Sequence, residues 1–324
     1  GNGSTAWPWA PCDERLCSAL PLRALAPATA VCAALFVLGV AGNALTVLVV
    51  ARGPRPPASL YLGSMAVSDL LILLGLPLDL YRLWRSRPWL FGQLLCRLSH
   101  FVAEGCAYCS VLHVTALTGE RYLAVRFPLR ARALASERRV KAVIGALWAV
   151  AFLSAVPFLF LVGVERAENG TDASRECKPT PQALRSGLLA AVFWVSTGYF
   201  VLPVACLHVL YGCVRRRLRH HAAPLQGPDA VRRARAHRQA LHILLAVVLA
   251  FVICWLPFHV GRIIFISTRD TRTMLFSQYF NLLALQLFYL SASINPILYN
   301  AVSKRYREAA CRLLLPRGPA RRAI

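Results

Sequence analysis

Seven long apolar stretches divide this chain, and polar, mostly basic segments separate them. They run approximately over residues 24–51, 60–81, 94–125, 140–162, 184–214, 240–266 and 276–301. Each stretch is at least as long as the roughly 20 apolar residues that a helix needs to cross a bilayer. A soluble helical protein would alternate apolar and polar faces at a period of 3.6 residues, but residues 146–162 and 244–258 are apolar all round. The pattern predicts an all-α membrane protein with a seven-transmembrane helix bundle.

The charged residues agree with this prediction and give the bundle an orientation. Only 16% of the 324 residues are charged, whereas soluble domains carry about 25%. The chain has 37 Lys and Arg against 14 Asp and Glu, and 24 of those 37 cations fall in the first, third and fifth connections and the C-terminal segment. Because basic connections stay in the cytoplasm, we expect the N-terminus outside and the C-terminus inside. The same rule explains the basic runs, so nucleic-acid binding is not expected.

This orientation predicts an extracellular N-terminal segment (1–23), the bundle (24–301) and a cytoplasmic segment (302–324). Glycosylation sequons begin at Asn2 and Asn169, both on the outer side. No cleavable signal peptide is visible, so we expect the first span to insert itself.

After the last span, residues 303–314 form an amphipathic pattern. We expect a short helix on the inner membrane surface, with its basic residues facing anionic lipid headgroups. Cys311 in this helix is either a palmitoylation site or a free thiol.

Several polar side chains fall inside the predicted spans, where they are costly and usually mark function. They are Asn43, Asp69, Ser110, Ser291 and Asn295. Hard oxygen ligands of this kind suit a hydrated sodium-like cation, and a purely structural hydrogen-bond network is the alternative. Beyond this possible sodium ion, no cofactor or metal is expected.

Short motifs occur in order in the seven spans, and together they resemble the rhodopsin-like G-protein-coupled receptors. The motifs are Gly42-Asn43, Ser68-Asp69-Leu70, Glu120-Arg121-Tyr122, Trp148, Pro203 with Tyr211, Cys254-Trp255-Leu256-Pro257 and Asn295-Pro296-Ile297-Leu298-Tyr299. Longer strings at 61–87, 255–264 and 276–300 resemble the ghrelin and motilin receptor family. The second outer connection (163–189) is short and looks more like the ghrelin type.

The resemblance implies a plasma-membrane receptor, not an enzyme, for a gut peptide hormone. It favours motilin, with a ghrelin-type peptide as the alternative, and a Gq-class G protein that activates phospholipase C and calcium release. A membrane transporter is the alternative from another class. It would show repeats between its two halves, and none is visible in the sequence.

By the same resemblance, the outer half of the bundle binds the ligand. Glu104 lies eight residues after Cys96, about 12 Å into the bundle, where a carboxylate strongly favours a cationic partner such as a peptide's ammonium group. An internal salt bridge without a ligand role is the alternative. The ligand-binding set implied is Asp79, Glu104, Phe258, His259, Arg262, Phe288 and Tyr289.

The resemblance also implies how the signal crosses the membrane. The relay residues implied are Phe251, Trp255, Pro257, Asn295, Pro296 and Tyr299, with Pro257 as the hinge of the sixth span. Glu120, Arg121 and Tyr211 would contact the G protein, and a disulfide would join Cys96 to Cys177. Many relatives carry an acid at the foot of the sixth span, where this chain has Ala236-His237-Arg238, so we expect signalling without ligand.

Overall fold

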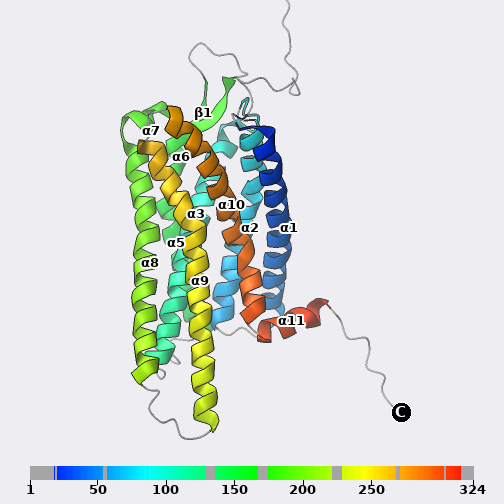
Figure 1. The fold of residues 1–324 in the computed structure, drawn as a ribbon, viewed down its shortest axis with the longest axis vertical. Helices are drawn as coiled ribbons and strands as arrows, with labels where there is room; N and C mark the ends of the chain where they lie inside the picture. Colours follow the sequence, from blue (N-terminus) through cyan, green and yellow to red (C-terminus); the bar gives the residue numbers. More distant parts are fainter. Residues whose placement is uncertain are drawn as a thin grey trace, which may run out of the picture.

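The fold is described from a computed structural model over residues 18, 20–53, 57–85, 87–127, 136–166, 174–220, 228–267, 271–302 and 304–314. Seven helical segments in this part of the chain are long and apolar enough to cross a membrane. They are formed by α1 (Leu22–Arg52), α2 (Pro57–Trp84), α3 (Gly92–Arg126), α5 (Glu137–Ala155) with α6 (Phe158–Leu161), α8 (Leu188–His220), α9 (Pro228–Ser267) and α10 (Thr271–Val302). The helices pack side by side as a bundle (Figure 1), which confirms the predicted fold class.

The helix α3 is at the centre of this bundle. In the apolar part of α3, 61% of the residues are buried, whereas in the apolar part of the fourth span only 17% are buried. The main core cluster joins α2, α3, α9 and α10 through residues such as Leu73, Cys106 and Trp255. Large apolar side chains such as Leu153 and Leu202 point outward and are more than half exposed. Such a surface suits lipid, because lipid tails solvate apolar side chains that water would not.

One predicted span boundary is wrong and a break inside another span was not predicted, and local backbone chemistry explains both. The fourth span was expected over residues 140–162 and lies at Glu137–Leu161, but α5 ends at Ala155 and a turn at Val156 and Pro157 separates it from α6. Proline has no N–H to continue the helical ladder. The fifth span was expected from residue 184, but a short helix α7 (Pro181–Arg185) precedes it. Gly187, with φ of 72°, breaks the two apart.

A two-stranded hairpin lies over one end of the bundle (Figure 1), where the sequence indicated only a connection. Strands β1 (Val162–Glu165) and β2 (Glu176–Pro179) pair antiparallel, with Val164 opposite Cys177. A disulfide joins Cys177 to Cys96 at the start of α3. We call this end of the molecule the hairpin end.

At the opposite end, the helix α11 (Lys304–Leu314) lies across the foot of the bundle beside α1 and α10 (Figure 1). The helix α9 extends beyond its neighbours at this α11 end. It is 40 residues long and begins 12 residues before the predicted apolar stretch. The added residues are rich in arginine, so hydrophobicity gave no signal for them.

Candidate functional site

A buried ion pair crosses the bundle below the hairpin. Arg262 of α9 donates from both terminal nitrogens to the two carboxylate oxygens of Glu104 on α3, with Nη1 3.0 Å from Oε2. Nη1 also donates to the Ser196 hydroxyl of α8 at 3.0 Å. Glu104 is only 4% exposed, so little water screens the pair. One guanidinium therefore joins three helices, α3, α8 and α9.

Aromatic rings hold this guanidinium in place from two further sides. Its carbon lies 4.1 Å from the ring centre of Phe258 and 4.8 Å from that of Phe193. Both distances are within cation–π range. The sequence gave Arg262 and Glu104 as candidates but gave no signal for Phe193. Ser196 was also missed, although the adjacent hydroxyls of Ser196 and Thr197 in an apolar span were visible.

A small pocket lies directly against the ion pair, between α3, α8 and α9. Glu104, Ala107, Tyr108, Val111, Ser196, Tyr199, Phe200, Trp255, Phe258 and His259 line it. Three predicted ligand residues, Glu104, Phe258 and His259, thus share one pocket with the predicted relay residue Trp255. Phe288 and Tyr289 are not among the lining residues.

An aromatic chain leads from this pocket deeper into the bundle. Phe288 of α10 lies 5.3 Å from both Phe258 and Trp255, measured between ring centres. Trp255 in turn lies 5.8 Å from Phe251. Offset and edge-to-face pairs at such distances add to the stability of packing. The structure therefore brings the predicted floor and relay residues into direct contact.

Asp79 occupies a second polar cluster, closer to the hairpin. Its Oδ1 accepts from Arg82 at 2.6 Å, and its Oδ2 accepts from the Tyr289 hydroxyl at 2.7 Å. Arg82 also donates to Ser99 of α3 at 2.7 Å. Two predicted ligand residues, Asp79 and Tyr289, thus join α2 to α10. Arg82 was missed because an arginine at the end of a span is usually a simple interface anchor.

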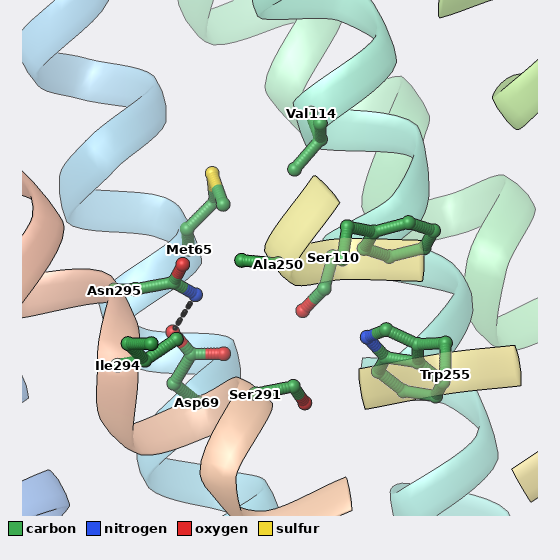
Figure 2. Close-up of a pocket in the computed structure, with 10 residues that line it drawn as sticks. Met65, Asp69, Ser110, Val114, Ala250, Trp255, Ser291, Ile294 and Asn295 are labelled. Carbon is green, nitrogen blue, oxygen red and sulfur yellow. Dashed lines mark hydrogen bonds between the residues drawn. The ribbon is translucent and has the colours of Figure 1, made fainter. Parts of the chain in front are cut away.

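A further pocket near the middle of the bundle gathers the predicted sodium ligands. Asp69, Ser110, Ser291 and Asn295 all line it, together with Met65, Val114, Ala250, Phe251, Trp255 and Ile294. Asn295 Nδ2 donates to one carboxylate oxygen of Asp69 at 2.8 Å. Figure 2 shows the other carboxylate oxygen directed toward the space between Ser110 and Ser291. Trp255 lines this pocket as well as the one beside the ion pair.

Asn43, which the sequence grouped with these residues, has a different place. Its amide nitrogen donates to the backbone oxygens of Gly39 and Ala292, at 2.9 and 2.8 Å. It joins α1 to α10 and is not among the lining residues of the pocket. The structure therefore places Asn43 outside the group that lines the central pocket, and its amide nitrogen ties α1 to α10.

The remaining predicted residues are only partly described. Glu120 lies near the end of α3 and Tyr211 is half-buried on α8, while the side chains of Arg121 and Tyr299 lie outside the described parts. Pro257 and Pro296 lie within α9 and α10. Cys311 is exposed on α11. The two sequons at Asn2 and Asn169 lie outside the described residues.

Comparison with known proteins decides the family. The profile described as "7 transmembrane receptor (rhodopsin family)" matches residues 42–299. The chain belongs to the rhodopsin family of seven-transmembrane receptors. It is accordingly a multi-pass membrane receptor and not an enzyme, and this membership sets aside the transporter interpretation.

Individual relatives refine this assignment. The chain is 56% identical to the human motilin receptor over 364 aligned positions, which cover 98% of the chain and 88% of the relative. It is 52% identical to the human growth hormone secretagogue receptor type 1, over 93% of the chain and 84% of the relative. The mouse neurotensin receptor type 1 is more distant, at 37% identity over 86% of the chain and 74% of the relative.

Proposed function

We propose that this rhodopsin-family receptor binds a peptide hormone of the motilin type at the plasma membrane, with its N-terminus outside the cell, and activates a Gq-class G protein. The similarity to the human motilin receptor along 98% of the chain supports the ligand class. The buried Glu104–Arg262 pair is the observation that carries the mechanism, because it places a carboxylate at the depth that an inserted peptide end would reach.

Ligand binding at this pair is an exchange of partners. Both carboxylate oxygens of Glu104 accept from Arg262 in the structure. An N-terminal ammonium group of a peptide would compete with Arg262 for Glu104, and the low dielectric favours whichever cation fits. The released Arg262 keeps Ser196 and the Phe258 ring as partners. Binding then changes the contacts of α9, the helix that contains Pro257.

Such a change can carry the signal if the ligand prefers one of two bundle states. Trp255 lines both the pocket beside the ion pair and the central polar pocket. We propose that α9 swings about Pro257 and opens a groove at the α11 end for a helix of the G protein, a known mode of peptide recognition. Glu120, Arg121, Tyr211 and Tyr299 are the proposed contacts there.

A ghrelin-type peptide is the second candidate, and one observation favours it. The motilin receptor alignment spans 364 positions, which exceeds the 324 residues of this chain. The relative therefore holds segments that this chain lacks. The alignment to the secretagogue receptor spans only 308 positions at 93% coverage, so its length agrees better with that of this chain.

Calcium mobilisation in transfected cells tests both candidates directly. Motilin and acylated ghrelin are applied to cells that express the chain, and to matched cells that lack Gq-class α-subunits. The proposal expects a response to motilin at lower concentration than to ghrelin, lost in the deficient cells. A lower half-maximal concentration for ghrelin reverses the ligand assignment, and a response that persists without Gq-class subunits refutes that coupling.

We further propose that the central pocket binds sodium as an allosteric modulator. A carboxylate, two hydroxyls and an amide oxygen are hard donors that suit this ion. Asp69 contributes the charge, and Ser110 and Ser291 would complete the ligand set. Agonist affinity is measured in sodium chloride and in the same concentration of N-methylglucamine chloride. Sodium should lower the affinity of the unsubstituted receptor and not that of Asp69→Asn, and equal affinities in both salts would end this proposal.

Two covalent modifications belong to the same proposal. Asn2 and Asn169 would carry glycans on the outer side, and Cys311 would carry a palmitoyl group beside the lipid-facing α11. Deglycosylation should increase electrophoretic mobility, and Cys311→Ala should abolish acyl exchange labelling at that helix.

A further inference from the structure

The helices α1 and α10 are joined by a ladder of contacts that continues into α11. Near the middle of α1, the Ser293 hydroxyl lies 2.9 Å from the Leu35 carbonyl and 2.8 Å from the Tyr289 carbonyl of its own helix. About two turns further along α1, Asn43 donates to the Ala292 carbonyl at 2.8 Å. Gly42 then approaches Pro296 so closely that an added Cβ would lie 2.9 Å from the proline ring. The α1 helix thus follows α10 down to Pro296.

The next contact of α1 is with α11. Thr46 lies one turn below Gly42 and is fully buried, and its hydroxyl lies 2.8 Å from the Tyr306 hydroxyl. Tyr306 is 8% exposed and packs with Val49 and Ala310. A hydrogen bond between hydroxyls at this depth has little competition from water.

The direction of this bond follows from the single proton of each hydroxyl. Thr46 Oγ1 donates its proton to the Gly42 carbonyl at 2.9 Å. Because Thr46 has a single hydroxyl proton, this bond and the bond to Tyr306 form together when the tyrosine donates to Thr46. The tyrosine hydroxyl, in addition to the packing of its ring, therefore holds α11 against α1.

These contacts fix two points of the chain on successive turns of one helix. Gly42 and Thr46 are four residues apart, or about 6 Å along α1. Their partners Pro296 and Tyr306 are ten residues apart in sequence. The intervening chain carries Tyr299, one of the proposed G-protein contacts. That part of the chain is therefore held at both ends by α1.

We propose that the Tyr306–Thr46 hydrogen bond is a latch that clamps the end of α10 and the start of α11 to α1, and that this clamp sets the efficacy of G-protein coupling. The coupling half of the inference rests on the proposed function. The clamp itself does not, since it concerns only the docking of α11.

Hydrogen exchange of the purified receptor in lipid nanodiscs tests the clamp without ligand or G protein. Tyr306→Phe removes the donor and keeps the ring, while Thr46→Val removes the acceptor and keeps the shape. Each should accelerate exchange of the α11 amides roughly two- to tenfold, the range expected for one net hydrogen bond. The double variant should add little, because both changes remove the same interaction. Thr46→Ser should restore slow exchange.

Thr115→Val is the matched control, because the Thr115 hydroxyl also donates to a carbonyl four residues earlier, at 2.8 Å. It should leave α11 exchange unchanged. Unchanged exchange in Tyr306→Phe, or an equal rise in Thr115→Val, would overturn the clamp.

The same variants in cells test whether the clamp sets the efficacy of G-protein coupling. Agonist affinity should stay constant while maximal G-protein activation falls in Tyr306→Phe and Thr46→Val. Faster exchange with unchanged activation would show that the clamp does not set coupling. A receptor that responds to neither motilin nor ghrelin would refute the proposed function instead, and the exchange data would then decide the clamp alone.

Discussion

The ion pair between Glu104 and Arg262 is costly to build and costly to break. Removing two charges from water carries a penalty of several kcal/mol for each ion, and hydrogen bonds must offset it. Ser196 and the rings of Phe193 and Phe258 supply such compensation for Arg262. Breaking a pair of this kind by neutralising one partner typically costs about 3–5 kcal/mol. A charge pair placed so deeply is more useful as a recognition element than as a stabiliser.

Glu104→Gln should therefore weaken agonist potency by roughly tenfold or more while the receptor still reaches the cell surface, because the amide keeps the shape and loses the charge. Calcium dose–response curves and surface labelling measure the two quantities. Thr118→Val, at a buried hydroxyl of α3 that donates to the Val114 carbonyl at 2.8 Å, is the matched buried-polar control. Equal potency for Glu104→Gln and the unsubstituted receptor would refute the ligand role of this carboxylate.

Close helix contacts at glycine give a second prediction at this scale. A Cβ on Gly39 would lie 2.6 Å from Ser293 Oγ and 2.8 Å from Leu73 Cδ1, whereas one on Gly198 meets nothing within 4 Å. Gly39→Ala should lower the free energy of unfolding by about 1–3 kcal/mol through overpacking. Gly198→Ala should raise it slightly, by about 0.5–1 kcal/mol, since alanine favours a helix. Thermal unfolding in detergent compares them, and equal midpoints would contradict the packing seen between α1, α2 and α10.

At the scale of the element, hydrophobicity predicted which segments cross the membrane but not where each helix ends. The ends of α5 and α8 depend on Pro157 and on the positive φ of Gly187, which are local backbone effects. The hairpin was not predicted, because strand pairing joins residues that are far apart in sequence. The extension of α9 is polar, and a search for apolar runs cannot find it.

In the site, too, the sequence identified important residues more readily than it identified the side chains that they contact. The intramembrane residues Glu104, Asp69 and Asn295 were found because a polar group in lipid is rare. Their partners were not all found, since Ser196 and Arg82 are ordinary residue types for their positions. A pairing such as Asp79 with Tyr289, 210 positions apart, depends on packing that no local pattern contains.

The foot of α9 provides a prediction for this element. The segment Ala236-His237-Arg238 carries no acid, so a carboxylate that would hold Arg121 in a closed state is missing from it. We expect G-protein signalling that rises with receptor expression in the absence of agonist, and His237→Glu should reduce it. Inositol phosphate accumulation at graded expression measures this. A signal independent of expression would contradict the interpretation.

At the scale of the whole molecule, the Cys96–Cys177 disulfide ties the hairpin to the central helix. The bond closes a stretch of 81 residues. In the chain-entropy account, closing a loop of this length stabilises the folded state by about 4.5 kcal/mol. The hairpin also contacts the bundle through Gln93, whose side-chain oxygen accepts from Val164 N at 2.6 Å. The hairpin is thus held to α3 at two points.

Replacing Cys96 and Cys177 together by serine should lower the unfolding midpoint and abolish high-affinity agonist binding, because the hairpin loses its covalent tie. Replacing the exposed Cys213 by serine is the control and should change neither quantity. Radioligand binding and thermal unfolding provide the measurements. Full agonist affinity in the double serine variant would show that Gln93 and the strand pairing alone position the hairpin.

Because α9 is 40 residues long, a small change of its direction at Pro257 would move its N-terminal end a long way. Pro257, the proposed hinge, lies 29 residues from the start of the helix at Pro228, so the arm between them measures roughly 44 Å. A tilt of only about 10° would carry the tip of this arm sideways by roughly 8 Å. In the proposed motion, small displacements around the Arg262 guanidinium would therefore become much larger at the far end of α9, where the G protein is proposed to bind.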